Sequence, residues 1–254
     1  MKLAQHDGRA VIVLGDSVAD VETASDGRFS SDPTHLYSQW ADFTAFAATV
    51  TEPTGPLDLA KLGSPAPHPR QVFAIGLNYQ SHAEESGMAA PAVPATFTKF
   101  PESLSGPFDD IPLVGTSSDW EVELVVVMGR DAHAVDEAEA WSHVAGLTIG
   151  QDISDRHLQF AAGMQFSLGK SRVGYGPMGP WLVTIDEFAT PDDLELGCSV
   201  DGETVQSART SDMIFSVPQL IAELSGVLPL RCGDVIFTGT PAGVGMARNP
   251  ARSL

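Results

Sequence analysis

The segment that most limits the fold is residues 119–130, which read DWEVELVVVMGR. Its second half, residues 124–128, is a run of apolar and mostly β-branched side chains, and such a run predicts a buried strand. Glu121 and Glu123 precede the run two positions apart, so in an extended chain their side chains lie on the same face. Two neighbouring carboxylates make each other harder to ionise. The sequence therefore requires that this face is open to water or that a positive group lies between the two glutamates.

The rest of the chain predicts an α+β protein that is mostly β, with peripheral helices, because short strand patterns alternate with Gly- and Pro-containing turns. Strands are expected at residues 10–14, 71–79 and 147–154, and at the start of 234–245, which runs into a glycine-rich loop. Helices are expected at residues 34–50, 136–146 and 216–226. Asp32-Pro33 starts the first helix, Gly146 stops the second, and the third has a capping box of Ser216 and Gln219 and ends at Gly226.

Residues 63–71, GSPAPHPRQ, contain three prolines in nine positions and form the best candidate for a domain boundary. We therefore expect a small N-terminal domain over residues 1–66 and a main domain over residues 67–254. No internal repeat or low-complexity tract divides the chain further.

The charge balance limits the possible partners. The chain has 33 acidic and 14 basic residues, a net charge of −19, and only four lysines. Such a surface repels nucleic acid and anionic lipid, so we expect no role on nucleic acid or at a membrane surface. No window approaches the ~20 apolar residues of a membrane span, and the N-terminus lacks a signal peptide. Cys198 and Cys232 lack metal-ligand spacing, so we expect two reduced thiols in a cytoplasmic protein.

Asp152 ends the strand pattern at residues 147–154 and is a third carboxylate that can join Glu121 and Glu123. Three carboxylates without a nearby His or Cys suit a hard cation, Mg²⁺ or Mn²⁺. Such a cation would remove the repulsion between the two glutamates. A solvated strand end explains the spacing equally well, so both interpretations stay open at this point.

Two further sets of residues have the chemistry of a site. His82 and Glu85 lie three positions apart in NYQSHAEESG, so on a helix the glutamate can orient the imidazole as a general base. Lys170 is one of the four lysines and could hold an anionic substrate or a developing oxyanion. Each has a simpler alternative, a surface His beside a surface Glu and an ordinary surface lysine. The loop TGTPAGVG at residues 238–245 is either an anion-binding glycine loop or a tight turn.

Taken together, several segments resemble the fumarylacetoacetate hydrolase family. They are VFAIGLNYQSHAEE, FTKFPESLSGP, DWEVELVVVMGR, GLTIGQDISDRHLQF, LGKSRVGYGPMGPW and DVIFTGTPAGVG, and they occur in the family's order over residues 72–245. The signatures D-x-E-x-E-L and T-G-T-P-x-G-V-G are the most specific parts. The resemblance implies a mixed β-roll with a small N-terminal domain, a homodimer, and a role in the breakdown of aromatic compounds.

The resemblance also implies roles for individual residues. Glu121, Glu123 and Asp152 would bind Mg²⁺ or Mn²⁺, with Ca²⁺ able to take its place. His82 and Glu85 would be the water-activating dyad, on a lid segment that orders over the substrate. The substrate's oxygens would contact Lys170 and Gln159, and its carboxylate would contact Thr240. Arg156 and Tyr79 lie within the matched motifs in supporting positions.

The chain departs from the family pattern in two places. His157 follows the arginine of DISDR where family members usually carry an acid, which would alter the edge of the site or the choice of substrate. The family normally continues past ARNPARSL through closing strands, so we expect that the C-terminal end is incomplete.

These residues suit a small anionic 2-oxo acid as substrate. A metal that chelates its carboxylate and keto oxygens would stabilise the enolate left by C–C cleavage. We hypothesise a Mg/Mn-dependent hydrolase acting on a 1,3-diketo acid such as an acylpyruvate or fumarylpyruvate. The alternatives are an oxaloacetate decarboxylase, a 2-hydroxyhepta-2,4-diene-1,7-dioate isomerase/decarboxylase, and, from another class, a non-catalytic metal-dependent oxo-acid binder.

Overall fold

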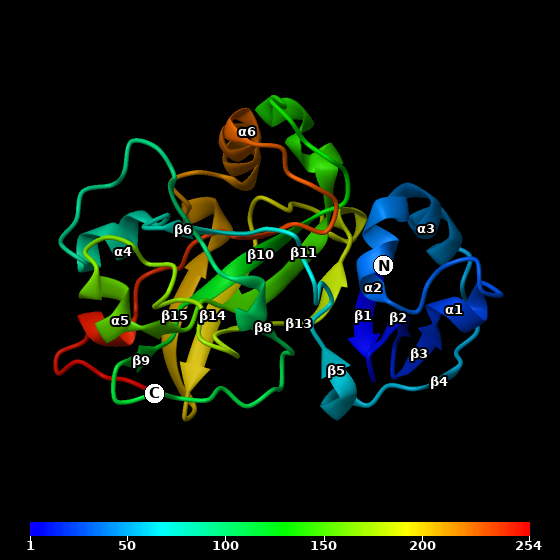
Figure 1. Cartoon of the computed structure of the whole chain (residues 1–254), viewed down its shortest axis with the longest axis horizontal. Coiled ribbons are helices and arrows are strands. Elements are labelled where there is room, and N and C mark those ends of the chain that lie inside the picture. The colour runs from blue at the N-terminus through cyan, green and yellow to red at the C-terminus, as the bar shows by residue number, and fades with distance from the viewer.

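The computed structural model describes residues 1–254, and its centre is a 12-stranded sheet (Figure 1). The strand order is β4-β3-β2-β1-β13-β11-β10-β16-β6-β7, with β5 paired to β1 and β8 paired to β13. The strands are β1 (Lys2–His6), β2 (Arg9–Leu14), β3 (Ser17–Asp20), β4 (Gly55–Pro56), β5 (Leu62–Gly63), β6 (Val72–Gly76), β7 (Ala95–Thr98), β8 (Leu104–Ser105), β10 (Val122–Met128), β11 (Val144–Gln151), β13 (Gly176–Val183) and β16 (Val235–Phe237). Two small sheets pair β9 (Ser118–Asp119) with β12 (Ser154–Asp155) and β14 (Glu195–Val200) with β15 (Glu203–Arg209).

Strand β10 confirms the buried strand predicted from residues 124–128, and all seven of its residues are buried. It lies between β11 and β16, antiparallel to both. Beyond β16 the sheet continues in parallel with β6. The mostly β composition predicted from the sequence is confirmed.

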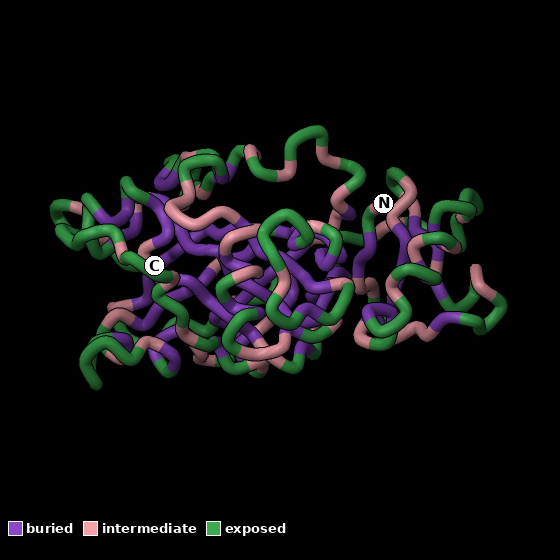
Figure 2. The backbone as a smooth tube through the Cα atoms, turned by 90° about the horizontal axis from the view of Figure 1, so that it is seen from above, coloured by how far each residue is buried: buried purple, intermediate pink, exposed green.

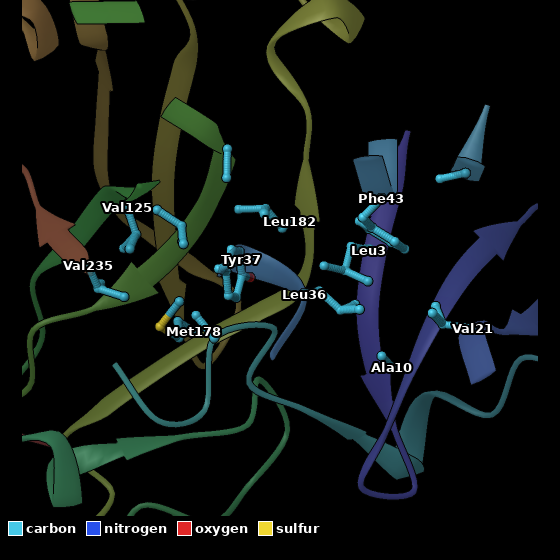
Figure 3. Packing of buried hydrophobic residues seen from close by; sticks show 14 of the residues in the cluster. Leu3, Ala10, Val21, Leu36, Tyr37, Phe43, Val125, Met178, Leu182 and Val235 are labelled. Carbon is cyan, nitrogen blue, oxygen red and sulfur yellow. The ribbon is translucent and has the colours of Figure 1, made fainter. Parts of the chain in front are cut away.

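The N-terminal strands extend the same sheet, because β1 pairs antiparallel with β13 through Lys2 opposite Val183. One core cluster contains both Leu3 of β1 and Leu182 of β13 (Figure 3). The domain boundary at residue 66 stays a prediction. In space the N-terminal strands form one end of the molecule and the helices α4 and α5 lie at the other (Figure 1).

The first two predicted helices are shorter than expected, whereas the third has its predicted length. The helices are α1 (Val21–Ala24), α2 (Pro33–Leu36), α3 (Trp40–Ala47), α4 (Gln80–Glu85), α5 (Arg156–Ala161) and α6 (Val217–Val227), with 3-10 turns η1 (Tyr37–Gln39), η2 (Leu59–Lys61), η3 (Pro101–Ser103), η4 (Glu137–His143), η5 (Ile185–Glu187), η6 (Thr210–Asp212) and η7 (Gly245–Ala247). The capping box of Ser216 and Gln219 is confirmed, and α6 runs one residue past Gly226.

The predicted helix at residues 34–50 begins at its Asp32 cap but is broken in the middle. There the buried Tyr37 donates its hydroxyl to the Pro65 carbonyl at 2.9 Å and stacks on Trp40. The sequence pattern does not contain these contacts, which accompany a tighter 3-10 turn between the two short helices.

The predicted helix at residues 136–146 is wrong in type and extent, since it is a 3-10 turn over Glu137–His143. Gly146 does not stop a helix but lies inside β11, opposite Val127 of β10. A Cβ atom at Gly146 would strike the Val183 carbonyl oxygen, so glycine is required there for close strand packing.

Buried backbone runs through the centre of the molecule, and the exposed segments lie mainly in loops and at the periphery (Figure 2). No helix combines the length and apolar character needed to cross a membrane.

Candidate active site and metal centre

The antiparallel pairing of β10 and β11 brings the three predicted metal ligands together. Val122 at the start of β10 lies opposite Gln151 at the end of β11, so Glu121 and Glu123 meet Asp152, which directly follows β11. One oxygen from each of the three carboxylates lies within 4.8 Å of the others. The side chains are buried, with residue exposures of 6%, 1% and 0% for Glu121, Glu123 and Asp152. Burial excludes the solvated strand end that the sequence left open.

Three cationic side chains surround this carboxylate cluster. Lys170 Nζ donates to Glu121 Oε2 at 2.7 Å and to Asp152 Oδ2 at 2.8 Å. Lys99 Nζ donates to the other Asp152 oxygen at 2.7 Å. Arg156 Nη1 donates to Glu121 Oε1 at 2.6 Å. Both oxygens of Glu121 and both oxygens of Asp152 are therefore bound to cationic groups.

Glu123 has no cationic hydrogen-bond partner and accepts one backbone N–H, from Gly239, at 2.8 Å. Burial, together with the charges of Asp152 and Glu121, raises the pKa of Glu123 well above its ordinary value. Burial acts in the same direction on Glu121, but Lys170 and Arg156 outweigh it and lower the pKa of that carboxyl to about 2. Among the three carboxylates, Glu123 is therefore the one whose charged form has no cationic partner, and it lies beside two other oxygen donors. This donor set and charge fit a hard divalent cation.

Two buried residues that the sequence analysis did not assign support the cluster. Lys99 is fully buried and also donates to the carbonyls of Lys170 and Tyr175. Asp119 accepts Arg156 Nε and Nη2 at 2.8 and 2.7 Å. The scarcity of lysine in the chain could have indicated Lys99. The position of Asp119 as the first acid of the D-x-E-x-E motif could have indicated that residue.

Asp119 also accepts the backbone N–H groups of Gly245 and Met246, at 2.7 and 3.0 Å. It therefore fixes both the guanidinium of Arg156 and the far end of the glycine-rich loop after β16.

His82 and Glu85 come together on the short helix α4, as predicted. His82 Nδ1 lies 3.1 Å from Glu85 Oε1, and Glu85 Oε2 accepts the Gly243 N–H at 2.8 Å. The Glu85 carboxylate is thereby fixed both by His82 of the helix and by the backbone of the glycine-rich loop. When Nδ1 carries the proton donated to Glu85, His82 Nε2 has a free lone pair.

A cavity of about 250 Å³ is lined by His82 of the dyad and by Glu121 of the carboxylate cluster. The predicted residues that line it are His82, Glu121, Gln159, Lys170 and Thr240. Much of the remaining wall is apolar, from side chains that include Met88, Phe97, Phe160, Met164 and Phe166. His157, the departure from the family pattern, is exposed and does not line the cavity.

The two predicted substrate contacts present different groups to the cavity. Gln159 Oε1 accepts Arg156 Nη1 at 3.0 Å, which leaves the amide N–H donors of Gln159 unengaged. The Thr240 hydroxyl donates to the Val122 carbonyl at 2.9 Å and accepts Gln206 Nε2 at 2.8 Å. A contact from Thr240 to a substrate carboxylate stays a prediction, and the side-chain hydroxyl already has both partners.

A sequence profile described as fumarylacetoacetate (FAA) hydrolase, C-terminal, matches residues 71–254. The crystal structure of a "putative HpcE protein" from Mycobacterium smegmatis is 54% identical, with a TM-score of 0.96 over 100% of this chain and 91% of that one. Maleylpyruvate hydrolase from Sphingobium sp. SYK-6, solved with manganese(II) and pyruvate, is 28% identical, with a TM-score of 0.80 over 96% of this chain and 90% of that one.

A curated Burkholderia lata relative, named only a "putative hydrolase", is 46% identical over 193 residues, which is 75% of this chain and 68% of the relative. These similarities confirm the fold expected from the resemblance and support an enzyme of the hydrolase or lyase class with a divalent-metal site. The chain belongs to the fumarylacetoacetate hydrolase family.

Proposed function

We propose that the protein is a divalent-metal-dependent hydrolase that cleaves a C–C bond of a 1,3-diketo 2-oxo acid of the acylpyruvate or fumarylpyruvate type. One observation carries the proposal: a single cavity is lined by His82, which is paired with Glu85, and by Glu121 of the buried carboxylate cluster. A binding protein for an oxo acid would not need the dyad.

Glu121, Glu123 and Asp152 would hold the cation. Their all-oxygen donor set suits Mg²⁺ or Mn²⁺, with Ca²⁺ able to substitute, and the similar maleylpyruvate hydrolase structure contains manganese. When bound, such a cation supplies Lewis-acid stabilisation of negative charge on the oxygens of an oxo acid.

His82 would act as the general base. Glu85 accepts the Nδ1–H and so leaves Nε2 free to take a proton from a water molecule that attacks the distal carbonyl. The hydrogen bond from the Gly243 N–H to Glu85 would keep the carboxylate in place during the proton transfer. This geometry supports a role for Glu85 in orienting the imidazole.

Lys170 would stabilise the charge that C–C cleavage leaves on the substrate. Burial lowers the pKa of its ammonium, but the carboxylates of Asp152 and Glu121 outweigh burial and raise that pKa, so the group stays charged. A fixed positive charge in a buried site stabilises an oxyanion more than it would in water. The unengaged amide N–H groups of Gln159 would donate to the same substrate oxygens.

The apolar wall of the cavity suits the carbon chain of the acyl group. The ring of Phe166 packs edge to face against Phe97 and against Phe160, with centroid distances of 5.7 and 5.8 Å. Met88 and Met164 line the same cavity and have flexible side chains that adapt to different acyl shapes.

The proposal is tested by offering the purified protein, with Mg²⁺ or Mn²⁺, an acylpyruvate, a fumarylpyruvate, oxaloacetate and 2-hydroxyhepta-2,4-diene-1,7-dioate in parallel. Pyruvate plus an acid from a diketone, abolished by EDTA and by His82→Ala, supports the hydrolase. Carbon dioxide from oxaloacetate alone, or isomerisation of the dienoate without cleavage of the diketones, would replace it by the decarboxylase or the isomerase. Metal-dependent oxo-acid binding without turnover of any substrate would favour the binder.

The homodimer and the cytoplasmic location remain proposals. Light scattering on the eluting protein tests the first, since a mass of one chain would contradict it. Fractionation of cells that express the protein tests the second.

A further inference from the structure

A second cavity, of about 530 Å³, lies where the N-terminal segment meets the main part of the chain. One wall comes from α2 and the proline-rich residues 66–70, and the other includes Asp131 and residues 231–233. We call it the junction cavity. It shares no lining residue with the cavity of the candidate active site.

The junction cavity is locally basic in an acidic protein. His35, His68, Arg70 and Arg231 line it, and Asp131 is the one acidic side chain among its lining residues. The chain as a whole has 33 acids against 14 lysines and arginines. The lining residues, with four basic or imidazole side chains and one carboxylate, therefore have the opposite charge balance to the chain as a whole.

The nearby carboxylates are already engaged. Asp32, whose carboxylate interacts with His35 and His68, accepts the Thr34 N–H at 2.9 Å. Asp131 accepts Arg231 Nη1 at 2.6 Å and the Cys232 N–H at 3.0 Å. Asp234 is a buried carboxylate that interacts electrostatically with Arg70. Its Oδ2 atom accepts the backbone N–H of Arg231 and the side-chain amide of Gln71, both at 2.7 Å. The guanidinium of Arg70 has no carboxylate within ion-pair distance, and Arg231 keeps its Nε and Nη2 donors unengaged.

The basic wall is carried on stiff backbone. Pro67 and Pro69 flank His68, and Pro69 directly precedes Arg70. The Tyr37 hydroxyl donates to the Pro65 carbonyl at 2.9 Å and ties this segment to the N-terminal helices. A wall that is ordered before binding loses less conformational entropy when a ligand arrives.

We propose that the junction cavity binds a small molecule through a phosphate or carboxylate group, which Arg70 and Arg231 hold while His68 adds a further donor. The planar fork of a guanidinium matches two oxygens of either group, and charge-assisted hydrogen bonds of this kind are the stronger ones. This site does not depend on the function proposed for the other cavity.

The two cavities lie at opposite ends of the parallel pair β6 and β16. Arg70 and Gly233 lie two residues before these strands begin, whereas Gly76 and Thr240 lie at or beyond their other ends. A substitution in the junction cavity therefore leaves the active-site side chains untouched.

The test is isothermal titration calorimetry of the full chain with inorganic phosphate and, in a separate arm, with malonate, both at constant ionic strength set by chloride. Arg70→Gln and His68→Asn remove exposed side chains of the cavity. Arg28→Gln is the control. Arg28 is also exposed, packs on Phe29 and does not line the cavity, so this variant removes the same charge elsewhere.

We expect one site per chain, with the tighter probe identifying the group that the cavity prefers. Arg70→Gln is expected to weaken binding about tenfold or more and His68→Asn by a smaller factor, while Arg28→Gln stays within about twofold of the wild type. The proposal is overturned if the wild type binds neither probe, if Arg70→Gln binds like the wild type, or if Arg70→Gln and Arg28→Gln weaken binding equally.

Discussion

Gly243 donates its backbone N–H to Glu85 Oε2 at 2.8 Å, which ties the glycine-rich loop after β16 to helix α4. The other oxygen of Glu85 lies 3.1 Å from His82 Nδ1. The Gly243 N–H and the His82 Nδ1–H thus each need an acceptor, and Glu85 supplies both. A carboxylate provides both acceptors, whereas an amide provides only one.

Replacing Glu85 by glutamine is therefore expected to disable the dyad without changing its size. The amide must turn its NH₂ group toward Gly243 or toward His82, and in the second case it favours the tautomer with the proton on Nε2. We expect kcat for diketone cleavage to fall roughly 10²- to 10⁴-fold, the range typical of a lost general base. Steady-state kinetics and a Mn²⁺ titration measure the change, and Mn²⁺ affinity should stay the same.

Glu84→Gln is the matched control for that variant. Glu84 is the neighbouring exposed glutamate and accepts only the Gln80 side chain, at 2.9 Å. Equal losses of activity in Glu84→Gln and Glu85→Gln would show that charge on the helix, and not the hydrogen bond to His82, is responsible.

Lys99 is expected to be essential for stability. Its ammonium is fully buried and binds Asp152 Oδ1, so Lys99→Met leaves that oxygen without its partner. Breaking a buried ion pair from one side typically costs about 3–5 kcal/mol. Urea unfolding in EDTA measures the loss.

Lys61→Met provides the comparison, because the Lys61 ammonium is exposed and lies 3.6 Å from the exposed Asp7. We expect it to change the free energy of unfolding by about 1 kcal/mol or less. Similar losses for the two variants would mean that the buried pair contributes no more than a surface pair.

Period-two alternation predicted that Glu121 and Glu123 share one face, and the structure places Asp152 beside them through the pairing of β10 with β11. Their role as metal ligands came from the resemblance to the family and stays a prediction. Their balance of charge could not be predicted. Lys99 directly follows β7 and lies 53 positions before Asp152 in the sequence, so no local pattern specifies their contact. Gly146 misled the sequence analysis for a similar reason, since a glycine required by packing against β13 looks like a helix stop. Local signals such as the Ser216 capping box were confirmed because their partners lie three residues apart.

Asp20 is expected to contribute to acid unfolding. The hydrogen bond from Arg9 outweighs partial burial and lowers the pKa of Asp20 from 3.8 to about 2. A depressed folded-state pKa gives stability that is present above the unfolded value and is lost as the pH falls through the folded value. The free energy of unfolding should therefore fall more steeply between about pH 4 and pH 2 in the wild type than in Asp20→Asn.

Asparagine keeps the cap on the Thr23 N–H, so the comparison isolates the charge. Urea unfolding at several pH values gives the two slopes. Identical slopes would contradict a contribution from the Arg9–Asp20 pair.

The most direct test of the account is Mn²⁺ binding to the wild type and to Glu123→Gln, measured by calorimetry. Glutamine has the same shape and can still accept the Gly239 N–H, but it lacks the charge that a cation would balance. We predict one Mn²⁺ per chain for the wild type. We expect an affinity at least about a hundredfold weaker for the variant, because loss of a ligand should exceed the ~10–100-fold cost of losing a residue that only supports a ligand. No Mn²⁺ binding by the wild type, or equal binding by both proteins, would contradict the proposed metal centre.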